Sequence, residues 1–340
     1  MSVLKTIPQL SSDPENTIAS LEGISVAIPH YNCQNYLLET LESVYKAKAA
    51  NMEIFVVDDQ TPDFNIREFL DANGYRDVRA YVNSKNLGSF ATFNECIKHA
   101  NRKLVHVLHA DDTVEQSFYK EVYRAFEEHD RLEAFFCAAE IIDHQSRRLN
   151  KIRPAEPLEV PYELNFLSQN PIRTPAVVIK KAAFEKVGLY RIDLPHTADW
   201  DLWIRLVLNC NSFYLDQPLC NYRVFEGSRT NLQRRQGKAW YGIVKIHYIM
   251  VHEYKLHSLK KRFLLSARLS SSSLINCIKR TTISRNRDTL NYSFESLSLS
   301  TMIVPVLFWP MLPCVWFFAI AKKIFTLISS IAMRSNFAAR

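Results

Sequence analysis

The chain has 340 residues and a formal net charge of +7 at pH 7. Residues 1–225 carry 24 basic and 31 acidic side chains, whereas residues 226–340 carry 18 basic and 4 acidic ones, which suggests two regions with different tasks. Only 7 glycines are present, and no two form a G-x-G pair, so a dinucleotide-binding fingerprint and a phosphate-binding Gly-Lys loop are excluded. Seven cysteines without a C-x-x-C pair favour reduced cytosolic thiols over a disulfide framework or a structural zinc site.

The first part of the chain alternates between predicted strands and helices. Apolar runs predict strands at residues 24–28, 52–57, 78–82 and 104–108, and helical spacing predicts helices at 36–45, 66–70 and 90–100. This order predicts a mostly parallel sheet with helices on both faces. Ligands of such sheets bind at the carboxyl ends of the strands. Here those ends carry His30-Tyr31-Asn32, Asp58-Asp59, residues 83–86 and Asp111-Asp112.

Further elements follow with less regular spacing. We expect a helix around residues 118–126, a strand at 134–138, a proline-containing surface loop at 144–161, a strand at 174–179, and helices at 182–187 and 201–208. From about residue 230 the character changes, and residues 238–268 predict one or two basic amphipathic helices.

Two acidic pairs at strand ends are candidates for ligand binding. Neighbouring carboxylates such as Asp111-Asp112 repel each other unless a cation balances them, and Mg²⁺ or Mn²⁺ would share its shell with a diphosphate. The alternative is a turn in which Thr113 caps a helix. Asp58-Asp59 has the same ambiguity between ribose or base binding and a capping role before Pro62.

A third acidic segment, Asp199-Trp200-Asp201, begins a predicted helix. One of its carboxylates could face a cleft and deprotonate a sugar hydroxyl as a general base. The alternative is that both acids stabilise the helix dipole.

Six segments, in order, resemble the family 2 glycosyltransferases with the GT-A fold. Residues 24–32 (ISVAIPHYN) are similar to "SVVIPTYN", 55–63 (FVVDDQTPD) to "VVDDGSTD", and Asn86-Leu87-Gly88 with Asn94 to "N-x-G…RN". Residues 108–112 (LHADD) resemble the D-x-D region, 198–206 (ADWDLWIRL) resemble "ED-x-DLWLRL", and 221–228 (NYRVFEGS) resemble "YRVHPGS". The resemblance covers about residues 24–230 and implies an α/β GT-A domain.

The resemblance also implies roles for particular residues. Asp199 would be the catalytic base of a single inverting displacement, and Asp112 would ligate a divalent metal ion, Mn²⁺ or Mg²⁺. The remaining candidates would bind the nucleotide sugar: Pro29, His30, Tyr31, Asp58, Asp59, Asn86, Gly88, Asn94 and Asp111. Trp203 and Arg205 are interpreted as helix packing and local pairing.

The chain departs from the family pattern at several of these places. His30 replaces Thr, Gln60 replaces Gly, Phe93 replaces Arg, His109 replaces the first Asp of D-x-D, Ala198 replaces Glu, and Phe225 replaces His. Metal dependence is less secure as a result, and the sugar cannot be read from the sequence because one contact can decide between donors.

The C-terminal region suggests a membrane partner. Residues 302–321 carry no charge and are long enough to span a bilayer, but Pro305, Pro310 and Pro313 disfavour a straight helix. A re-entrant hairpin or a helix pair in the interface fits the prolines and the flanking basic residues. The alternative is a soluble helical subdomain. Nucleic-acid binding would leave the apolar run without a role.

Together these observations predict three regions: an N-terminal extension (1–23), a GT-A glycosyltransferase domain (24–228) and a basic, helical, membrane-associating region (229–340). The expected function is inverting transfer of a sugar from a UDP-sugar to a hydroxyl of a lipid-linked saccharide in surface polysaccharide synthesis. The expected location is the cytoplasmic face of the bacterial inner membrane. Two alternatives are a non-catalytic sugar-binding scaffold of the same fold and a metal-dependent nucleotidyltransferase.

Overall fold

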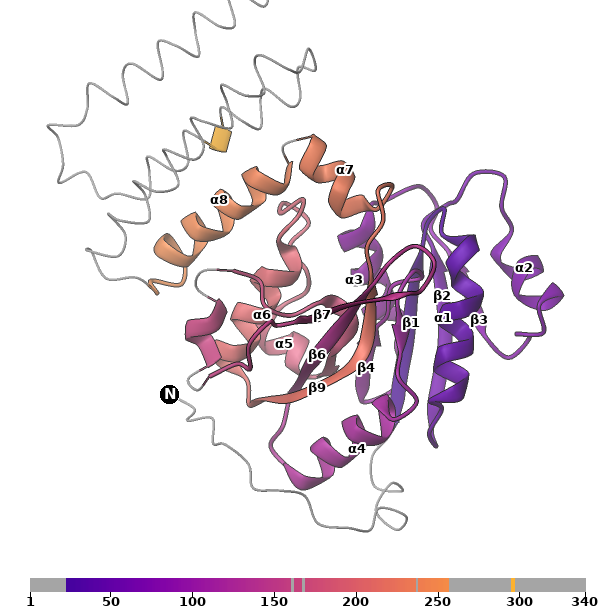
Figure 1. The fold of residues 1–340 in the computed structure, drawn as a ribbon, viewed down its shortest axis with the longest axis horizontal. Coiled ribbons are helices and arrows are strands. Elements are labelled where there is room, and N and C mark those ends of the chain that lie inside the picture. The colour runs from indigo at the N-terminus through magenta and orange to yellow at the C-terminus, as the bar shows by residue number, and fades with distance from the viewer. Residues whose placement is uncertain (1–22, 160–161, 167–168, 237, 257–294, 297–340) are drawn as a thin grey trace, which may run out of the picture. The chain divides into compact units, whose positions relative to one another are not determined.

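The computed structural model describes residues 23–159, 162–166, 169–236, 238–256 and 295–296 (Figure 1). The chain divides into two compact units. The first comprises the described residues up to Asp193 together with Ala198–Glu226, and the second comprises Leu194–Thr197 and the described residues from Gly227 onward.

The N-terminal half of the first unit is a parallel sheet. Its strands β1 (Ile24–His30), β2 (Met52–Asp58), β3 (Arg79–Val82) and β4 (Leu104–Val107) lie in the order β3-β2-β1-β4. Helices α1 (Gln34–Lys46), α2 (Ile66–Ala72) and α3 (Ser89–His99) connect them. All seven residues of β1 are buried, as expected for a strand covered on both faces. The strands and helices expected in this part of the chain are confirmed.

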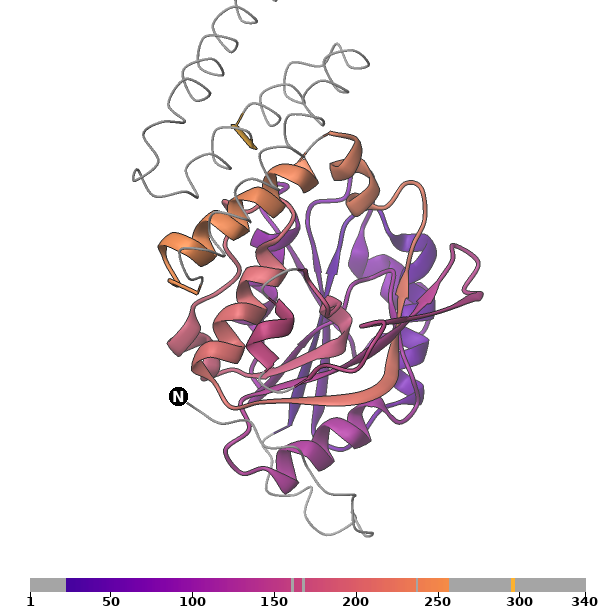
Figure 2. The same cartoon turned by 60° about the vertical axis from the view of Figure 1, so that its left-hand side comes forward.

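The rest of the sheet is mixed and extends the parallel half within the expected α/β architecture. It contains β5 (Thr113–Val114), β6 (Ala134–Ile142), β7 (Arg148–Arg153), β8 (Val177–Lys180) and β9 (Ser212–Arg223). β8 pairs antiparallel with β4 and with β6, β9 is parallel to β6, and β5 is antiparallel to β9. β9 is long and bent (Figure 2), and its register shifts beside Ala138. Strand direction depends on these distant pairings, and the local hydrophobic pattern does not report it.

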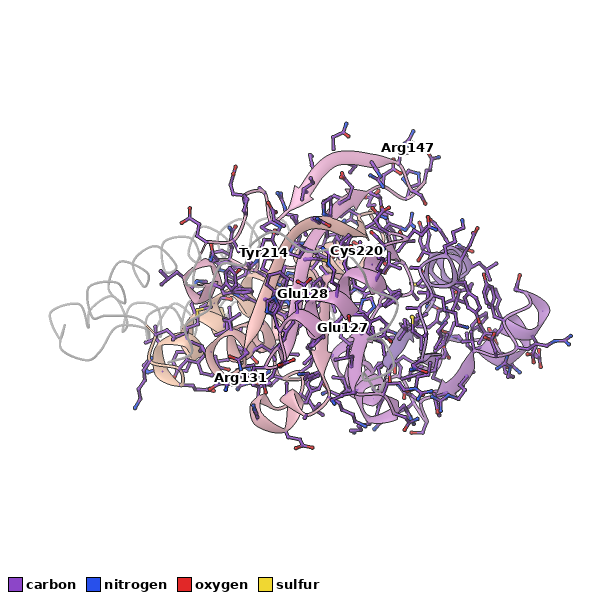
Figure 3. The ribbon with its side chains drawn as sticks, turned by 90° about the horizontal axis from the view of Figure 1, so that it is seen from below. Glu127, Glu128, Arg131, Arg147, Tyr214 and Cys220 are labelled. Carbon is purple, nitrogen blue, oxygen red and sulfur yellow. The ribbon has the colours of Figure 1, made fainter. Side chains whose placement is uncertain are left out.

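The segment 144–161, expected to be a loop, contains an additional strand. β7 pairs antiparallel with β6, and Arg147 lies in the turn between them (Figure 3). Five of the six residues of β7 are exposed, so this strand lacks the alternation of apolar and polar residues by which strands are recognised. Pro154, Pro157 and Pro161 all follow its last residue, Arg153.

The remaining helices of the first unit are α4 (Phe118–Glu128), α5 (Ala183–Val187) and α6 (Ala198–Asn209), with short 3₁₀ turns at Tyr162–Phe166 and Thr174–Ala176. In both ribbon views α4 lies at the lower end of the sheet (Figures 1 and 2). Trp203, Leu206 and Val207 of α6 are buried, as their spacing predicts.

β1 and β4 separate at their carboxyl ends, and this opening positions the candidate site. Their pairing runs only from Ile24 to Ala27 of β1, while β1 stays paired with β2 as far as His30. Pro29, which has no N–H to donate, lies just beyond the last residue paired with β4. The order of the strands reverses direction between β1 and β4, the place where open α/β sheets bind their ligands.

In the second unit, α7 (Arg229–Arg235) and α8 (Lys238–His252) are described. The Ser228 hydroxyl caps α7 by accepting from the Asn231 N–H at 3.4 Å. Along α8, Val244 and Val251 are buried with Trp240 and Tyr248 packed against them. Among the described residues no helix is both long and apolar enough to cross a membrane. Residues 302–321, on which the membrane expectation rests, lie outside the described residues.

Candidate active site

The loop after β4 is held in place by a helix on the other side of the opening. The Thr40 hydroxyl of α1 lies 3.0 Å from the carbonyl oxygen of Ala110 and 2.8 Å from that of Asp112. Thr40 is fully buried, so these polar contacts are protected from water. They fix the backbone of the acidic pair relative to the first helix.

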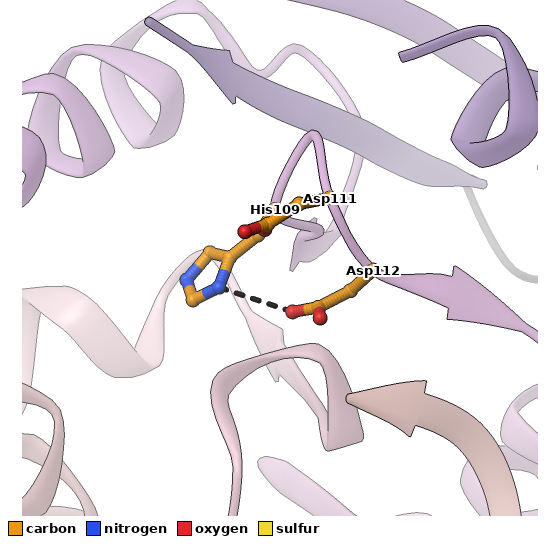
Figure 4. Close-up of side chains that lie close together, drawn as sticks. All are labelled: His109, Asp111 and Asp112. Carbon is orange, nitrogen blue, oxygen red and sulfur yellow. Dashed lines mark ion pairs between the residues drawn. The ribbon is translucent and has the colours of Figure 1, made fainter. Parts of the chain in front are cut away.

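His109, Asp111 and Asp112 gather at the end of this loop (Figure 4). Each offers one potential ligand atom, and these atoms all lie within 4.8 Å of one another. His109 Nδ1 and Asp112 Oδ2 form an ion pair at 3.1 Å. Thr113 is the first residue of β5 and Ser117 precedes α4, so the alternative in which Thr113 caps a helix is wrong.

Asp112 is completely buried, and only one of its two carboxylate oxygens accepts a hydrogen bond. Its Oδ1 accepts a hydrogen bond of 2.8 Å from the backbone N–H of Arg223. Its Oδ2 accepts none from any described residue, although it faces the His109 ring. A buried carboxylate oxygen without a donor is costly, and a cation at this position would remove that cost. The residues present therefore fit the divalent ion that the D-x-D resemblance implies.

The pKa of Asp111 shows that the two neighbouring carboxylates repel each other. Burial, followed by the charge of Asp112, raises its pKa to about 7, and this outweighs the opposing effect of His109 and Arg223. Two adjacent carboxylates with little solvent cannot both ionise easily. A bound cation would favour the charged forms of both.

Arg223 holds this loop in place through several contacts. It lies in the matched segment 221–228, but the sequence assigned it no role in the site. Its Nε donates to the Asp111 carbonyl oxygen at 2.7 Å, and its Nη2 donates to Glu39 at 2.8 Å. The guanidinium lies 4.5 Å from the centre of the Tyr36 ring. The side chain is fully buried and connects β9, α1 and the acidic loop.

The His109 ring is held between an aromatic side chain and acidic groups. It stacks on Phe93 with ring centroids 5.0 Å apart. Burial lowers the pKa of His109, but Asp112, Asp111 and Asp199 together outweigh that effect and raise it. The contribution of Asp199 shows that the structure brings this residue of α6 into the electrostatic field of the β4 loop.

Asp199 lies in the first turn of α6 with both oxygens hydrogen-bonded. Oδ1 accepts from the Trp200 N–H, and Oδ2 accepts from the Asn170 side-chain amide, each at 2.8 Å. The other acid of this turn, Asp201, is fully buried and pairs with Arg205 at 2.6 Å, which agrees with the expectation of local pairing. Asn170 comes from a loop and has no sequence signal of its own.

Asp58 and His30 form a buried pair at the ends of β1 and β2. His30 Nδ1 lies 2.7 Å from Asp58 Oδ1, and the Thr61 hydroxyl and N–H donate to Oδ1 and Oδ2 at 2.7 and 2.9 Å. Burial raises the pKa of Asp58, but the hydrogen bonds from His30 and Thr61 outweigh it and hold the pKa below its usual value. This arrangement is the turn-capping role left open for Asp58.

Asp59 and its neighbours organise the loop after β3. Asp59 Oδ1 accepts from the Leu87 N–H and Oδ2 from the Gly88 N–H, both at 2.8 Å, and the Asn83 amide also donates to Oδ1 at 2.8 Å. Asn86 is exposed, and its amide donates to the Asp59 carbonyl oxygen at 3.2 Å. Asp59 therefore shapes the loop that carries Asn86 and Gly88.

Three further candidates lie around the same edge of the sheet. Pro29 is buried in β1, and Tyr31 is 43% exposed, so it is free to stack on a ligand. Asn94 makes a two-point contact with Tyr190, donating to its carbonyl oxygen at 2.9 Å and accepting from its N–H at 3.0 Å. Both ends of the Asn94 amide are thus used to hold a loop. Nucleotide binding by the nine candidate residues stays a prediction.

Comparison with known proteins shows what the chain is similar to. Residues 25–185 match Glycosyl transferase family 2. An uncharacterized glycosyltransferase of Rickettsia typhi is 28% identical over 242 residues, covering 68% of this chain and 74% of its own. The minor teichoic acid biosynthesis protein GgaB of Bacillus subtilis is 24% identical over 311 residues, covering 82% of this chain and 33% of its own.

The fold also matches a solved structure. Residues 1–349 of S. aureus TarS superpose with a TM-score of 0.59 at 17% sequence identity, covering 83% of this chain and 81% of TarS 1–349. TarS 1–349 has also been solved in complex with UDP-GlcNAc, with a TM-score of 0.57. The first unit therefore has the GT-A fold, and residues 25–185 are similar to the family 2 glycosyltransferases.

Proposed function

We propose that the chain is an inverting glycosyltransferase that moves a sugar from a UDP-sugar to a hydroxyl of a lipid-linked saccharide in surface polysaccharide synthesis. The observation that carries the proposal is the His109, Asp111 and Asp112 cluster after β4, whose electrostatic field includes the charge of Asp199. The relation to a teichoic acid biosynthesis protein and the fold shared with a protein that binds UDP-GlcNAc support the donor and the polymer class.

The roles of the residues follow from their surroundings. Asp199 has its orientation fixed by Asn170 and the Trp200 N–H, so it is placed to accept the proton of the acceptor hydroxyl. Asp112, with Asp111, would hold the divalent ion, Mn²⁺ or Mg²⁺. When bound, this ion neutralises the charge that develops on the leaving diphosphate. Tyr31, Asp59 and the loop at Asn86–Gly88 would hold the nucleoside.

The proposal includes the cellular location of the protein. The acceptor would be reached at the cytoplasmic face of the bacterial inner membrane, where residues 230–340 provide basic and apolar side chains. A basic segment beside an anionic leaflet gains about 1 kcal/mol for each Lys or Arg. The sequence of this region supports attachment near a lipid-linked acceptor.

The first test is a panel of nucleotide sugars with the full-length protein, monitored by thermal stabilisation and by metal-dependent hydrolysis. Asp199→Asn should keep donor-induced stabilisation and lose transfer by a factor of about 10³, because the amide cannot accept the proton. Asp130→Asn, at an exposed position after α4, is the matched control and should behave as wild type. Turnover near the wild-type rate in Asp199→Asn would show that this residue is not the base.

A further inference from the structure

We propose that His109 is itself a metal ligand through Nδ1, and that the site therefore binds a first-row divalent transition-metal ion in preference to Mg²⁺. The inference deepens the proposed function, because the ion is the one that would hold the donor diphosphate. It concerns the position at which the chain departs from D-x-D, where an imidazole replaces a carboxylate.

The spacing of the atoms fits one coordination shell. Two adjacent ligands on an octahedral ion, with bonds of about 2.1 Å, lie about 3.0 Å apart. His109 Nδ1 and Asp112 Oδ2 are 3.1 Å apart, and the Asp111 ligand atom completes a set within 4.8 Å. The distance between His109 Nδ1 and Asp112 Oδ2 therefore fits two neighbouring ligands of one metal ion as well as it fits an ion pair.

The side chains of the cluster are already held in position without a metal ion. Asp112 Oδ2 is buried and accepts no hydrogen bond from the described residues, whereas the other oxygen is held by the Arg223 N–H. The His109 ring is fixed by stacking on Phe93, and the backbone between His109 and Asp112 is fixed by Thr40. Ligands oriented by such surroundings bind without reorganisation.

The chemistry of the donor set determines the class of ion. Mg²⁺ prefers oxygen ligands and keeps several waters, whereas an imidazole nitrogen suits the first-row transition metals. Exchanging one carboxylate for one imidazole therefore weakens Mg²⁺ binding relative to Mn²⁺ and the later ions of the series. The two carboxylates that remain keep the site suited to Mn²⁺ as well.

Mn²⁺ alone serves as the probe. It is added to the metal-free, full-length protein, bound Mn²⁺ is counted by electron paramagnetic resonance, and coupling of the bound ion to ¹⁴N is measured by electron spin echo modulation. We expect one bound ion with ¹⁴N coupling in the wild type. His109→Asp should still bind Mn²⁺ but lose the coupling, and the ratio of the Mg²⁺ to the Mn²⁺ dissociation constant should fall about tenfold.

His144→Asp is the matched control, since His144 is exposed in the turn between β6 and β7. It should retain both the coupling and the metal preference, and circular dichroism should show that both variants are folded. Wild-type Mn²⁺ binding without ¹⁴N coupling, or an unchanged Mg²⁺ to Mn²⁺ ratio in His109→Asp, would overturn the inference and reduce His109 to an ion-pair partner of Asp112. Detection of ¹⁴N coupling without sugar transfer from any nucleotide-sugar donor would contradict the proposed function but would still support His109 as a metal ligand.

Discussion

At the scale of single residues, three positions that depart from the family pattern show what the replacing side chains do. Two of them contact each other, and the third adopts an unusual backbone conformation. Phe93 and His109, which replace Arg and Asp, stack on each other. Gln60, which replaces Gly, adopts φ of 58°, the left-handed region that glycine enters without steric cost. Gln60 therefore adopts a backbone conformation that glycine favours, and two stacked rings occupy the positions where the family pattern has charged side chains.

Asn170 is a positioning residue for Asp199. Its amide donates to Asp199 Oδ2 at 2.8 Å, and its own Oδ1 is buried without a partner among the described residues. Asn170→Ala should lower kcat about tenfold to a hundredfold, because a carboxylate free to rotate is less often aligned with the acceptor hydroxyl. The donor KM should change little, since the amide touches no donor-binding candidate.

Steady-state kinetics on Asn170→Ala and on Asn165→Ala test this role. Asn165 also donates from its amide, to the Glu159 carbonyl oxygen at 2.7 Å, so it controls for losing a loop hydrogen bond as such. A donor KM that rises in parallel with a fall in kcat, or equal losses in both variants, would show that Asn170 only stabilises the loop.

At the scale of secondary-structure elements, β9 and α1 support the acidic loop from opposite sides. Arg223 of β9 donates to Asp111 and Glu39, and Thr40 of α1 lies against the Ala110 and Asp112 carbonyl oxygens. The geometry of the metal candidates is therefore set by residues more than 70 positions away on one side and 111 positions on the other.

Arg223→Lys should destabilise the first unit strongly. Lysine keeps the charge but cannot reproduce the planar fork that serves Asp111 and Glu39 together, and the groups left behind lose their donors. We expect the free energy of unfolding to fall by about 2–3 kcal/mol.

Arg147→Lys is the comparison for that measurement. Its ion pair with Asp143 at 2.8 Å is largely exposed on the arginine side, so the change should cost much less stability than Arg223→Lys. Chemical denaturation followed by tryptophan fluorescence gives both values. Equal losses for the two variants would mean that the buried Arg223 network adds little to stability.

The same elements show how far the sequence could predict the fold. The strands and helices from Ile24 to Val107 were predicted because each has a regular apolar pattern, which in β1, β2 and β4 is also largely buried. β7 was missed because it is an exposed edge strand, and β9 because Pro218, Asp216 and Gln217 interrupt its pattern. The Asp199 candidate was found through a motif. Arg223 lies in another matched segment, 221–228, but a motif does not report its several long-range contacts, and no local pattern marks Asn170.

At the scale of the whole molecule, the net charge changes sign along the chain close to the boundary between the two units. The acidic region carries the sheet and the candidate site. The basic region begins where the second unit begins, at about residue 227. This division supports a catalytic part that works beside an anionic surface.

Membrane attachment by the C-terminal region can be tested on the whole chain. Removing residues 300–340 deletes the uncharged run 302–321 and the basic pair Lys322-Lys323. We expect binding to vesicles of phosphatidylglycerol and phosphatidylethanolamine to fall at least tenfold, because both the apolar and the electrostatic contributions are lost. Co-sedimentation at low and high salt separates the two contributions, since only the electrostatic one is screened.

The charge reversal of the pair, Lys322→Glu with Lys323→Glu, is the matched variant. It should lose binding to the anionic vesicles in part and leave binding to neutral phosphatidylcholine unchanged, because the apolar run stays intact. A truncated protein that still sediments with vesicles would move the attachment to residues 230–290, where α7 and α8 begin a second basic and apolar segment.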